Sequence, residues 1–176
     1  MQQRKKFFKH FLLVLSLCAP TVPAISVSAQ STAEYKLKAG FVLNFMKLSS
    51  LQQTDGQYSV CVVGSSLVQN AFSSLESRKI NDVEVSVKEL SRTSQAPGCS
   101  VIFIAHEIAA QRSFVTASRG HSILTVGEDD SFLSDGGIIN FYSEGNKIRF
   151  EINLKKSKKE KIDMSSKLLR LARIVE

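Results

Sequence analysis

The sequence predicts an α/β protein, a single domain with a mixed, mostly parallel sheet flanked by helices. Two observations carry this prediction. Short apolar runs alternate with segments of helical periodicity between residues 58 and 126, and strands that alternate with helices form sheets with parallel neighbours. Residues 101–105 (VIFIA) are continuously apolar, as expected for a strand that is buried on both faces of its sheet.

The domain is expected to open with an amphipathic helix over residues 34–47. Ser31 followed by Glu34 matches a capping box, which marks the start of a helix. Tyr35, Ala39 and Val42 then recur at helical intervals. The resulting apolar face packs either on a core or in a partner's groove.

The middle of the chain predicts a β-α-β-β-α-β order. Residues 83–87 alternate strictly between apolar and polar side chains, which indicates a strand with one polar face. The expected strands are residues 58–63, 83–87, 101–105 and 122–126, and the expected helices are residues 67–77 and 107–118.

The last forty residues predict a β-hairpin and a terminal helix. Two strands, residues 137–142 and 147–153, are joined by the turn sequence SEGN, whose composition suits a hairpin. A basic helix near residues 155–161 follows, and residues 165–175 are expected to form the last helix, with its leucines on the apolar side.

Residues 1–29 have the order of parts of a cleaved signal peptide. Four basic residues precede a short apolar core, residues 11–19, and residues 27–29 form a small-residue cleavage site. The core is shorter than the roughly 20 residues that cross a bilayer. We therefore expect residues 30–176 to be a single domain exported through the Sec pathway. A lipoprotein signal ending at Cys18 and a retained membrane anchor are the alternatives, although Leu17 stands where a lipoprotein signal has a small residue.

Charge and cysteine content limit the classes of protein to which this chain can belong. The chain has a formal net charge of +7, but without the four basic residues of the signal it keeps 19 basic against 16 acidic residues. That balance does not favour nucleic-acid binding. Cys61 and Cys99 remain after cleavage, and an even pair in an oxidising compartment favours a disulfide. A buried Cys61 with a free thiol at Cys99 is the alternative.

Motifs for catalysis, metals and cofactors are missing from the sequence. His106 and Glu107 begin like a zinc-protease helix, but Ala110 stands where the second histidine should be. His121 has no partner at metal-ligand spacing, and no glycine-rich phosphate loop occurs. The sequence therefore predicts a protein that is not an enzyme and has no metal or cofactor.

Candidate binding residues lie in three places. Gly64, Ser65 and Ser66 follow the first strand, where backbone amides at a helix start bind anions, although such a turn is often merely tight. Arg149 and Glu151 share one face of a strand and form either a surface pair or a partner contact. A basic run gives either a solvated helix face or a patch for an anionic partner, and its lysines are Lys155, Lys156, Lys158 and Lys159.

Five segments together resemble the YfiR family. They are residues 35–47 (YKLKAGFVLNFMK), 61–64 (CVVG), 99–104 (CSVIFI), 149–154 (RFEINL) and 165–172 (SSKLLRLA). They occur in the family's order and cover essentially all of the chain beyond the signal.

The resemblance implies a small periplasmic α/β regulator without catalytic residues. Such proteins bind the periplasmic sensor region of an inner-membrane diguanylate cyclase and hold it inactive, which lowers cyclic di-GMP and biofilm formation. The resemblance also implies a homodimer, and it matches Cys61 and Cys99 to a family disulfide. A second family disulfide has no counterpart because no cysteine follows Cys99, and the chain has no tryptophan after its first helix.

A surface for the partner is expected on residues 155–170 with the adjoining hairpin. A periplasmic sensor of small ligands is the competing function, with residues 64–67 and the loop of residues 128–136 lining one pocket. A hydrolase would lack any recognisable pair of nucleophile and base.

Overall fold

The computed structural model describes residues 27–175. Its helices are α1 (Val27–Lys47), α2 (Ser66–Phe72), α3 (Gln111–Ala117), α4 (Leu154–Lys159) and α5 (Ser166–Leu169), with short 3-10 helices η1 (Ser73–Leu75) and η2 (Thr93–Gly98). Its strands are β1 (Tyr58–Val63), β2 (Lys79–Ile80), β3 (Val83–Glu89), β4 (Val101–Ile104), β5 (Leu124–Gly127), β6 (Ile139–Glu144), β7 (Lys147–Asn153) and β8 (Arg173–Val175). Within residues 27–175, no helix is long and apolar enough to cross a membrane.

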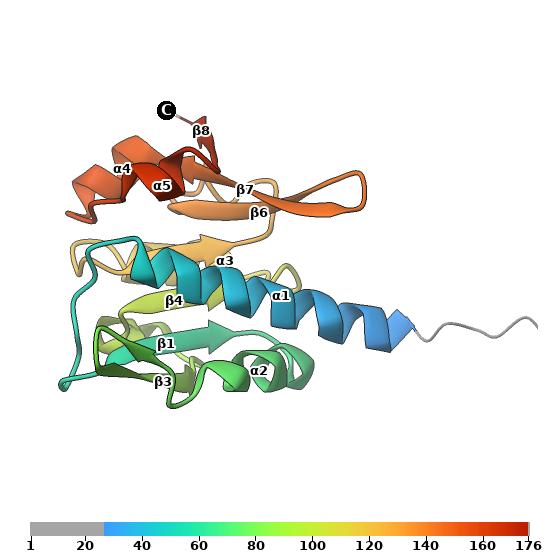
Figure 1. Cartoon of the computed structure of the whole chain (residues 1–176), viewed down its shortest axis with the longest axis horizontal. Coiled ribbons are helices and arrows are strands. Elements are labelled where there is room, and N and C mark those ends of the chain that lie inside the picture. The colour runs from blue at the N-terminus through green and yellow to red at the C-terminus, as the bar shows by residue number, and fades with distance from the viewer. Residues whose placement is uncertain (1–26, 176) are drawn as a thin grey trace, which may run out of the picture.

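The predicted fold class is confirmed. The eight strands form one sheet in the order β2-β3-β1-β4-β5-β6-β7-β8, flanked by helices (Figure 1). Neighbours from β3 to β6 are parallel, whereas β7 returns antiparallel to β6 as the predicted hairpin. The chain moves to one side of β1 to form β3 and then crosses to the other side to form β4. The direction of winding therefore reverses between β1 and β4, which makes this a doubly wound fold.

Two cores cover the two faces of the sheet. On one face α1 and α2 pack on the strands (Figure 1), with the Phe72 and Phe103 rings stacked at 4.4 Å between centroids. On the other face lie α3, η2 and Phe132. The second core contains the Cys61–Cys99 disulfide, whose sequence separation is 38 residues. A loop of that length is worth about 4 kcal/mol in the chain-entropy model.

The loop between β5 and β6 is closed by one aromatic ring. Phe132 is fully buried, and its two long edges contact the backbone of Gly127 and Gly137, where a Cβ atom would clash with ring carbons. Glycine is required at both positions because a ring fills the space that a side chain would occupy.

The first and the last predicted helices differ from the structure. α1 begins at Val27, upstream of Ser31, so Ser31 does not cap it, and the Glu34 carboxylate instead pairs with the Lys38 ammonium at 2.6 Å. The predicted terminal helix of residues 165–175 ends at Leu169, and β8 follows, with Ile174 in register with Ile152 of β7. The free edge of β7 and the β-branched residues 174–175 favour a strand here.

The sequence also misplaced or missed smaller elements. The helix expected over residues 107–118 begins only at Gln111, and the helix expected over residues 67–77 ends as a 3-10 turn at Leu75. β2 was not predicted, since two residues carry no periodicity. The predicted signal peptide lies outside the described residues apart from residues 27–29, so its cleavage stays a prediction.

The packing around Phe132 gives a testable prediction. Gly127→Ala should lower the free energy of unfolding by about 1–3 kcal/mol, because an added methyl group overpacks a filled core. Urea unfolding followed by circular dichroism measures the change. The matched control is Gly40→Ala on the exposed side of α1, where a Cβ atom meets nothing within 4 Å and should stabilise the helix by about 0.5–1 kcal/mol. Equal destabilisation by both variants would contradict this account.

Candidate functional site

A charged cluster lies where α1 passes the carboxyl ends of β4 and β5. Tyr35 and Lys38 lie one turn apart on α1, Glu128 directly follows β5, and His106 comes shortly after β4. The carboxyl edge of a parallel sheet is where doubly wound domains bind their ligands. The fold thus brings these four residues to the edge at which a site is expected.

Glu128 is the centre of the cluster. One of its oxygens, Oε2, pairs with the Lys38 ammonium. The other, Oε1, accepts hydrogen bonds from the Tyr35 hydroxyl at 2.9 Å and from the His106 backbone N–H at 2.8 Å. Lys38 also pairs with Glu34 at 2.6 Å and lies 4.9 Å from the centroid of the Tyr35 ring. Each charged atom in the centre therefore has a partner.

Burial makes these contacts strong. The Lys38 side chain is 8% exposed and that of Glu128 is 5% exposed, so each charge depends on the other for the solvation it has lost. Burial raises the pKa of Tyr35 well above its usual value, and the neighbouring Glu128 carboxylate raises it further. Tyr35 therefore stays a neutral hydrogen-bond donor throughout the physiological pH range.

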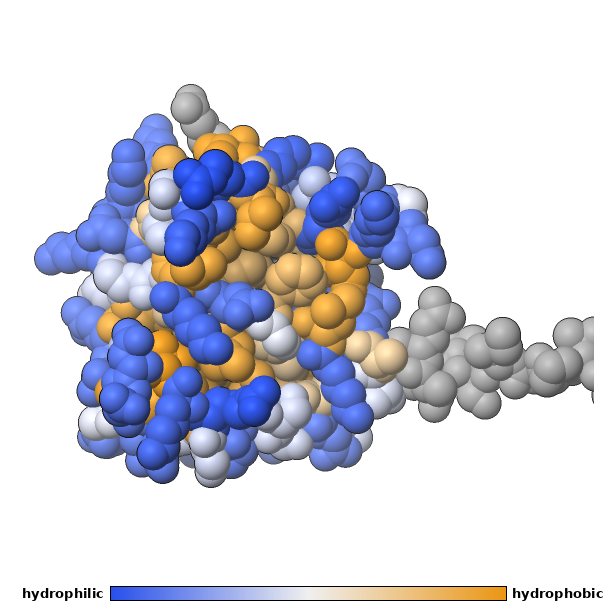
Figure 2. Space-filling model, in the orientation of Figure 1, coloured by the Kyte–Doolittle hydropathy of each residue, from blue (hydrophilic) through white to orange (hydrophobic). Residues whose placement is uncertain are grey.

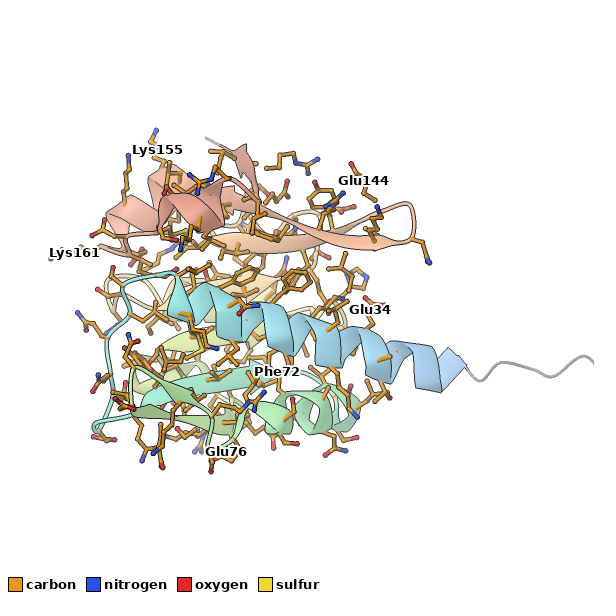
Figure 3. All side chains as sticks on the ribbon, in the orientation of Figure 1. Glu34, Phe72, Glu76, Glu144, Lys155 and Lys161 are labelled. Carbon is orange, nitrogen blue, oxygen red and sulfur yellow. A yellow bond between two sulfur atoms is a disulfide. The ribbon has the colours of Figure 1, made fainter. Side chains whose placement is uncertain are left out.

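A cavity of about 520 Å³ opens beside this cluster. Glu34, which lines it, lies on the side of α1 that faces the β6–β7 hairpin (Figure 3). His106 is at the rim, where its Nδ1 atom is 3.3 Å from Asp129 and its side chain is 72% exposed. The lining residues are Glu34, Tyr35, Lys38, His106, Glu128, Asp130, Phe141, Tyr142, Ser143 and Ile148. The cavity is large enough for a small organic molecule.

The Asp129 carboxylate is fixed by its own loop. The Ser131 hydroxyl donates to it at 2.7 Å, and the Ser131 backbone N–H donates at 2.9 Å. These hydrogen bonds lower the pKa of Asp129, with a smaller contribution from Gln111. The charge beside His106 is thus held in place by the turn that follows β5.

The predicted anion site at residues 64–66 lies apart from this cavity. The Ser65 backbone N–H donates to the Glu107 carboxylate at 2.9 Å, so the chain supplies its own anion at that turn. Gly64 lines a separate cavity of about 260 Å³. Glu128 and Asp130 of the loop line the larger cavity together with residues of α1 and the hairpin, and Gly64 lines the smaller one.

The predicted partner residues divide into paired and unpaired groups. Lys155, Lys158 and Lys159 are exposed, whereas Lys156 is largely buried and pairs with Glu160 at 3.0 Å. On the hairpin, Arg149 pairs with Glu144 at 3.3 Å, and Glu151 pairs with Arg173 of β8. Figure 3 shows Lys155 and Lys161 well apart from Glu34, so the basic segment is not part of the cavity.

Metal binding has no support in the described part of the chain. Among residues 27–175, no group of three or more histidine, cysteine, aspartate or glutamate side chains is arranged to hold a metal ion. Of the acidic residues after β5, Glu128 pairs with Lys38, Asp129 with His106 and Asp135 with Arg112.

The sequence interpretation missed Lys38 and Glu128. One signal was available, because Lys38 lies three residues after Tyr35 and four before Val42, on the apolar stripe of the first helix. A lysine on a buried stripe requires a buried carboxylate. The partner was not predictable, since nothing in the sequence aligns residue 128 with this turn of α1.

The fold and the cluster together define a doubly wound α/β domain with a charged cleft at the carboxyl edge of its sheet. The chain belongs to the YfiR/HmsC-like family, whose sequence model matches residues 35–173. That range includes both cores, the disulfide and the charged cluster, and it confirms the resemblance seen in the sequence. No curated protein matches the chain.

Two solved structures share the fold. A conserved domain protein from Vibrio cholerae O1 biovar El Tor str. N16961 aligns with a TM-score of 0.57 at 9% identity, over 81% of this chain and 60% of that chain. An ABC domain from Streptococcus pneumonia, in complex with L-Trp, aligns with a TM-score of 0.52 at 9% identity, over 80% of this chain and 60% of that chain. Identity this low shows the fold alone, and the chain spans only 60% of the length of either protein.

The Lys38–Glu128 pair gives a prediction on stability. Lys38→Met should lower the free energy of unfolding by about 3 kcal/mol or more, because it leaves a buried carboxylate unpaired. Lys36→Met, two residues away on the exposed side of α1, should change it by less than about 0.5 kcal/mol. Chemical denaturation of both variants measures the difference. If Lys38→Met were as stable as Lys36→Met, the pair would not hold α1 to the sheet edge.

Proposed function

We propose that this protein is a periplasmic regulator that represses a membrane-bound diguanylate cyclase by binding the cyclase's periplasmic sensor region. The observation that carries the proposal is membership of the YfiR/HmsC-like family across residues 35–173. Regulators of this family act by binding rather than by catalysis, and repression lowers cyclic di-GMP and biofilm formation.

Export to the periplasm is supported by two independent features. The signal pattern of residues 1–29 directs the chain across the inner membrane. The Cys61–Cys99 disulfide is of a kind that persists in oxidising compartments such as the periplasm. Both features belong to a protein that meets the outer portion of a membrane enzyme rather than its cytoplasmic catalytic domain.

The absence of a reaction centre in the described residues also favours binding. The cluster around Glu128 has its hydrogen-bonding capacity taken up by Lys38, Tyr35 and the His106 backbone. Burial raises the pKa of the Tyr35 hydroxyl beside Glu128 and keeps it neutral, so the cluster fixes the shape of a surface. The proposed regulator acts as a homodimer, as its family does.

The function is tested by cyclic di-GMP in living cells. Deletion of the gene should raise intracellular cyclic di-GMP and biofilm formation several-fold, because the cyclase loses its repressor. A chromosomal Cys61→Ser variant should give part of that rise, since loss of the disulfide lowers the folded population. Mass spectrometry of nucleotide extracts measures the change, and reintroduction of the wild-type gene is the control. Unchanged cyclic di-GMP after deletion would refute the proposal.

The cavity beside Glu128 supports a second candidate function, a periplasmic sensor of small ligands. Its volume of about 520 Å³ suits a small molecule, and one structural neighbour of this fold was solved with L-Trp. Protein purified from the periplasm should then release a small molecule on denaturation, and Asp130→Asn on the cavity wall should reduce the amount. Native mass spectrometry of the folded protein checks this outcome, and a ligand-free mass in every preparation would count against the sensor.

A further inference from the structure

We infer that the partner of this regulator docks an amphipathic helix, with a carboxylate beside its apolar stripe, into a groove between α1 and the β6–β7 hairpin. This inference rests on the proposed function and goes beyond it by naming the surface and the chemistry of the occupant. The α1–hairpin groove has a volume of about 510 Å³ and is lined by Leu37 and Phe41 from α1 and by Lys147, Ile148 and Arg149 from the hairpin, among others.

The floor of the groove is apolar and open to solvent. Leu37 is 53% exposed, and among residues 31–175 only Leu171 and Ile174 are comparable large hydrophobic side chains in the open. Phe41 and Ile148 are half-buried beside it. Figure 2 shows apolar surface gathered where α1 faces the hairpin. A concave apolar surface of this kind marks a site of interaction.

The α1 wall of the groove is packed on aromatic rings of the core. The Phe41 ring lies 5.9 Å from Phe141 and 6.0 Å from Phe150, between centroids, so the wall on the α1 side is anchored in the core. The Lys38–Glu128 pair holds the same stretch of helix against the sheet edge. Because the groove is preformed, little ordering of side chains opposes binding.

The shape of the groove selects a helix as the occupant. Ile148 and Phe150 lie two residues apart on the face of β7 that packs towards α1, so the groove presents side chains from that face. A segment that lies on side chains must satisfy its own backbone hydrogen bonds, as a helix does. Helices that enter such grooves present apolar anchors at spacings of three and four residues.

Charge sets the remaining chemistry. Within the described residues Lys147 has no ion-pair partner, and Arg149 has only an exposed contact with Glu144. Across the groove Glu34 is the one acidic lining residue, and it shares Lys38 with Glu128. The two basic lining residues both lie on the hairpin, so a carboxylate beside the apolar stripe of the partner complements the hairpin wall.

The test uses matched variants in the strain itself. The chromosomal gene is changed to encode Leu37→Gln or Lys147→Glu, with Leu171→Gln and Lys36→Glu as controls of the same chemistry elsewhere. Lys158→Glu is a separate test of the basic segment. Leu37 and Leu171 are both exposed, so neither change should disturb folding, and circular dichroism and periplasmic abundance verify this. The two groove variants should raise cyclic di-GMP as deletion does, and the two controls should leave it low.

Direct binding provides the second measurement. The probe is the purified periplasmic sensor region of the diguanylate cyclase whose own deletion abolishes the rise in cyclic di-GMP. Isothermal titration calorimetry should show binding about 30-fold weaker for Leu37→Gln, the loss expected of an anchor residue. Lys147→Glu should bind about tenfold more weakly, with a smaller dependence on salt.

Several outcomes would overturn the inference, and each is distinct. If deletion raises cyclic di-GMP while the groove variants repress normally, the groove is not the docking surface, although the proposed function stands. Loss of repression by Lys158→Glu instead would assign docking to the basic segment of α4. A change from dimer to monomer in Leu37→Gln, with sensor binding intact, would assign the groove to a second copy of this chain. If Leu37→Gln and Lys147→Glu lost binding to anionic lipid vesicles and kept binding to the sensor region, the groove would be assigned to the membrane surface. Unchanged cyclic di-GMP after deletion would remove both proposals.

Discussion

The buried contact between Lys38 and Glu128 is the constraint on which the functional half of this molecule depends. α1 is the longest helix described and covers one face of the sheet. A charge pair with little access to water fixes the turn that carries Lys38 at the carboxyl edge of β5. Because each ion would be costly alone, the helix has one acceptable position. Both cavities beside the helix follow from that position, since each is lined by Glu34 from α1 and Ile148 from the hairpin.

The position of Glu128 is itself determined by packing on the opposite face of the sheet. Glu128 stands between Gly127 and the loop that Phe132 closes, and the Phe132 ring is held between the backbones of Gly127 and Gly137. The two cores are therefore not independent. A ring buried behind the sheet orients a carboxylate at its edge, and the carboxylate holds a helix in front. Packing in the interior therefore determines the position of the surface that is available to a partner.

Most of the fold was predictable from the sequence because apolar patterns report burial. Apart from β2, the strands from Tyr58 to Val126 and the hairpin follow directly from their apolar patterns, and family segments in order supported them. The failures have physical causes. β8 is an edge strand of three residues, and leucines next to it imitate a helix. The Lys38–Glu128 contact and the α1–hairpin groove join residues about ninety or more positions apart, and no local pattern carries information about such a meeting. Lys38 within an apolar stripe was the one local sign.

The two outer strands have a consequence for the behaviour of the protein at high concentration. A parallel sheet with long bare margins would recruit further strands from other molecules, which is the first step of ordered aggregation. Here the sheet ends in β2, with two residues including Lys79, and in β8, with three residues including Arg173. A positively charged side chain on each outer strand discourages pairing with another copy, and residues 147–150 of β7 extend beyond β8. The sheet ends at eight strands. A partner is therefore expected to bind in a groove of the molecule rather than by adding a strand to a sheet edge.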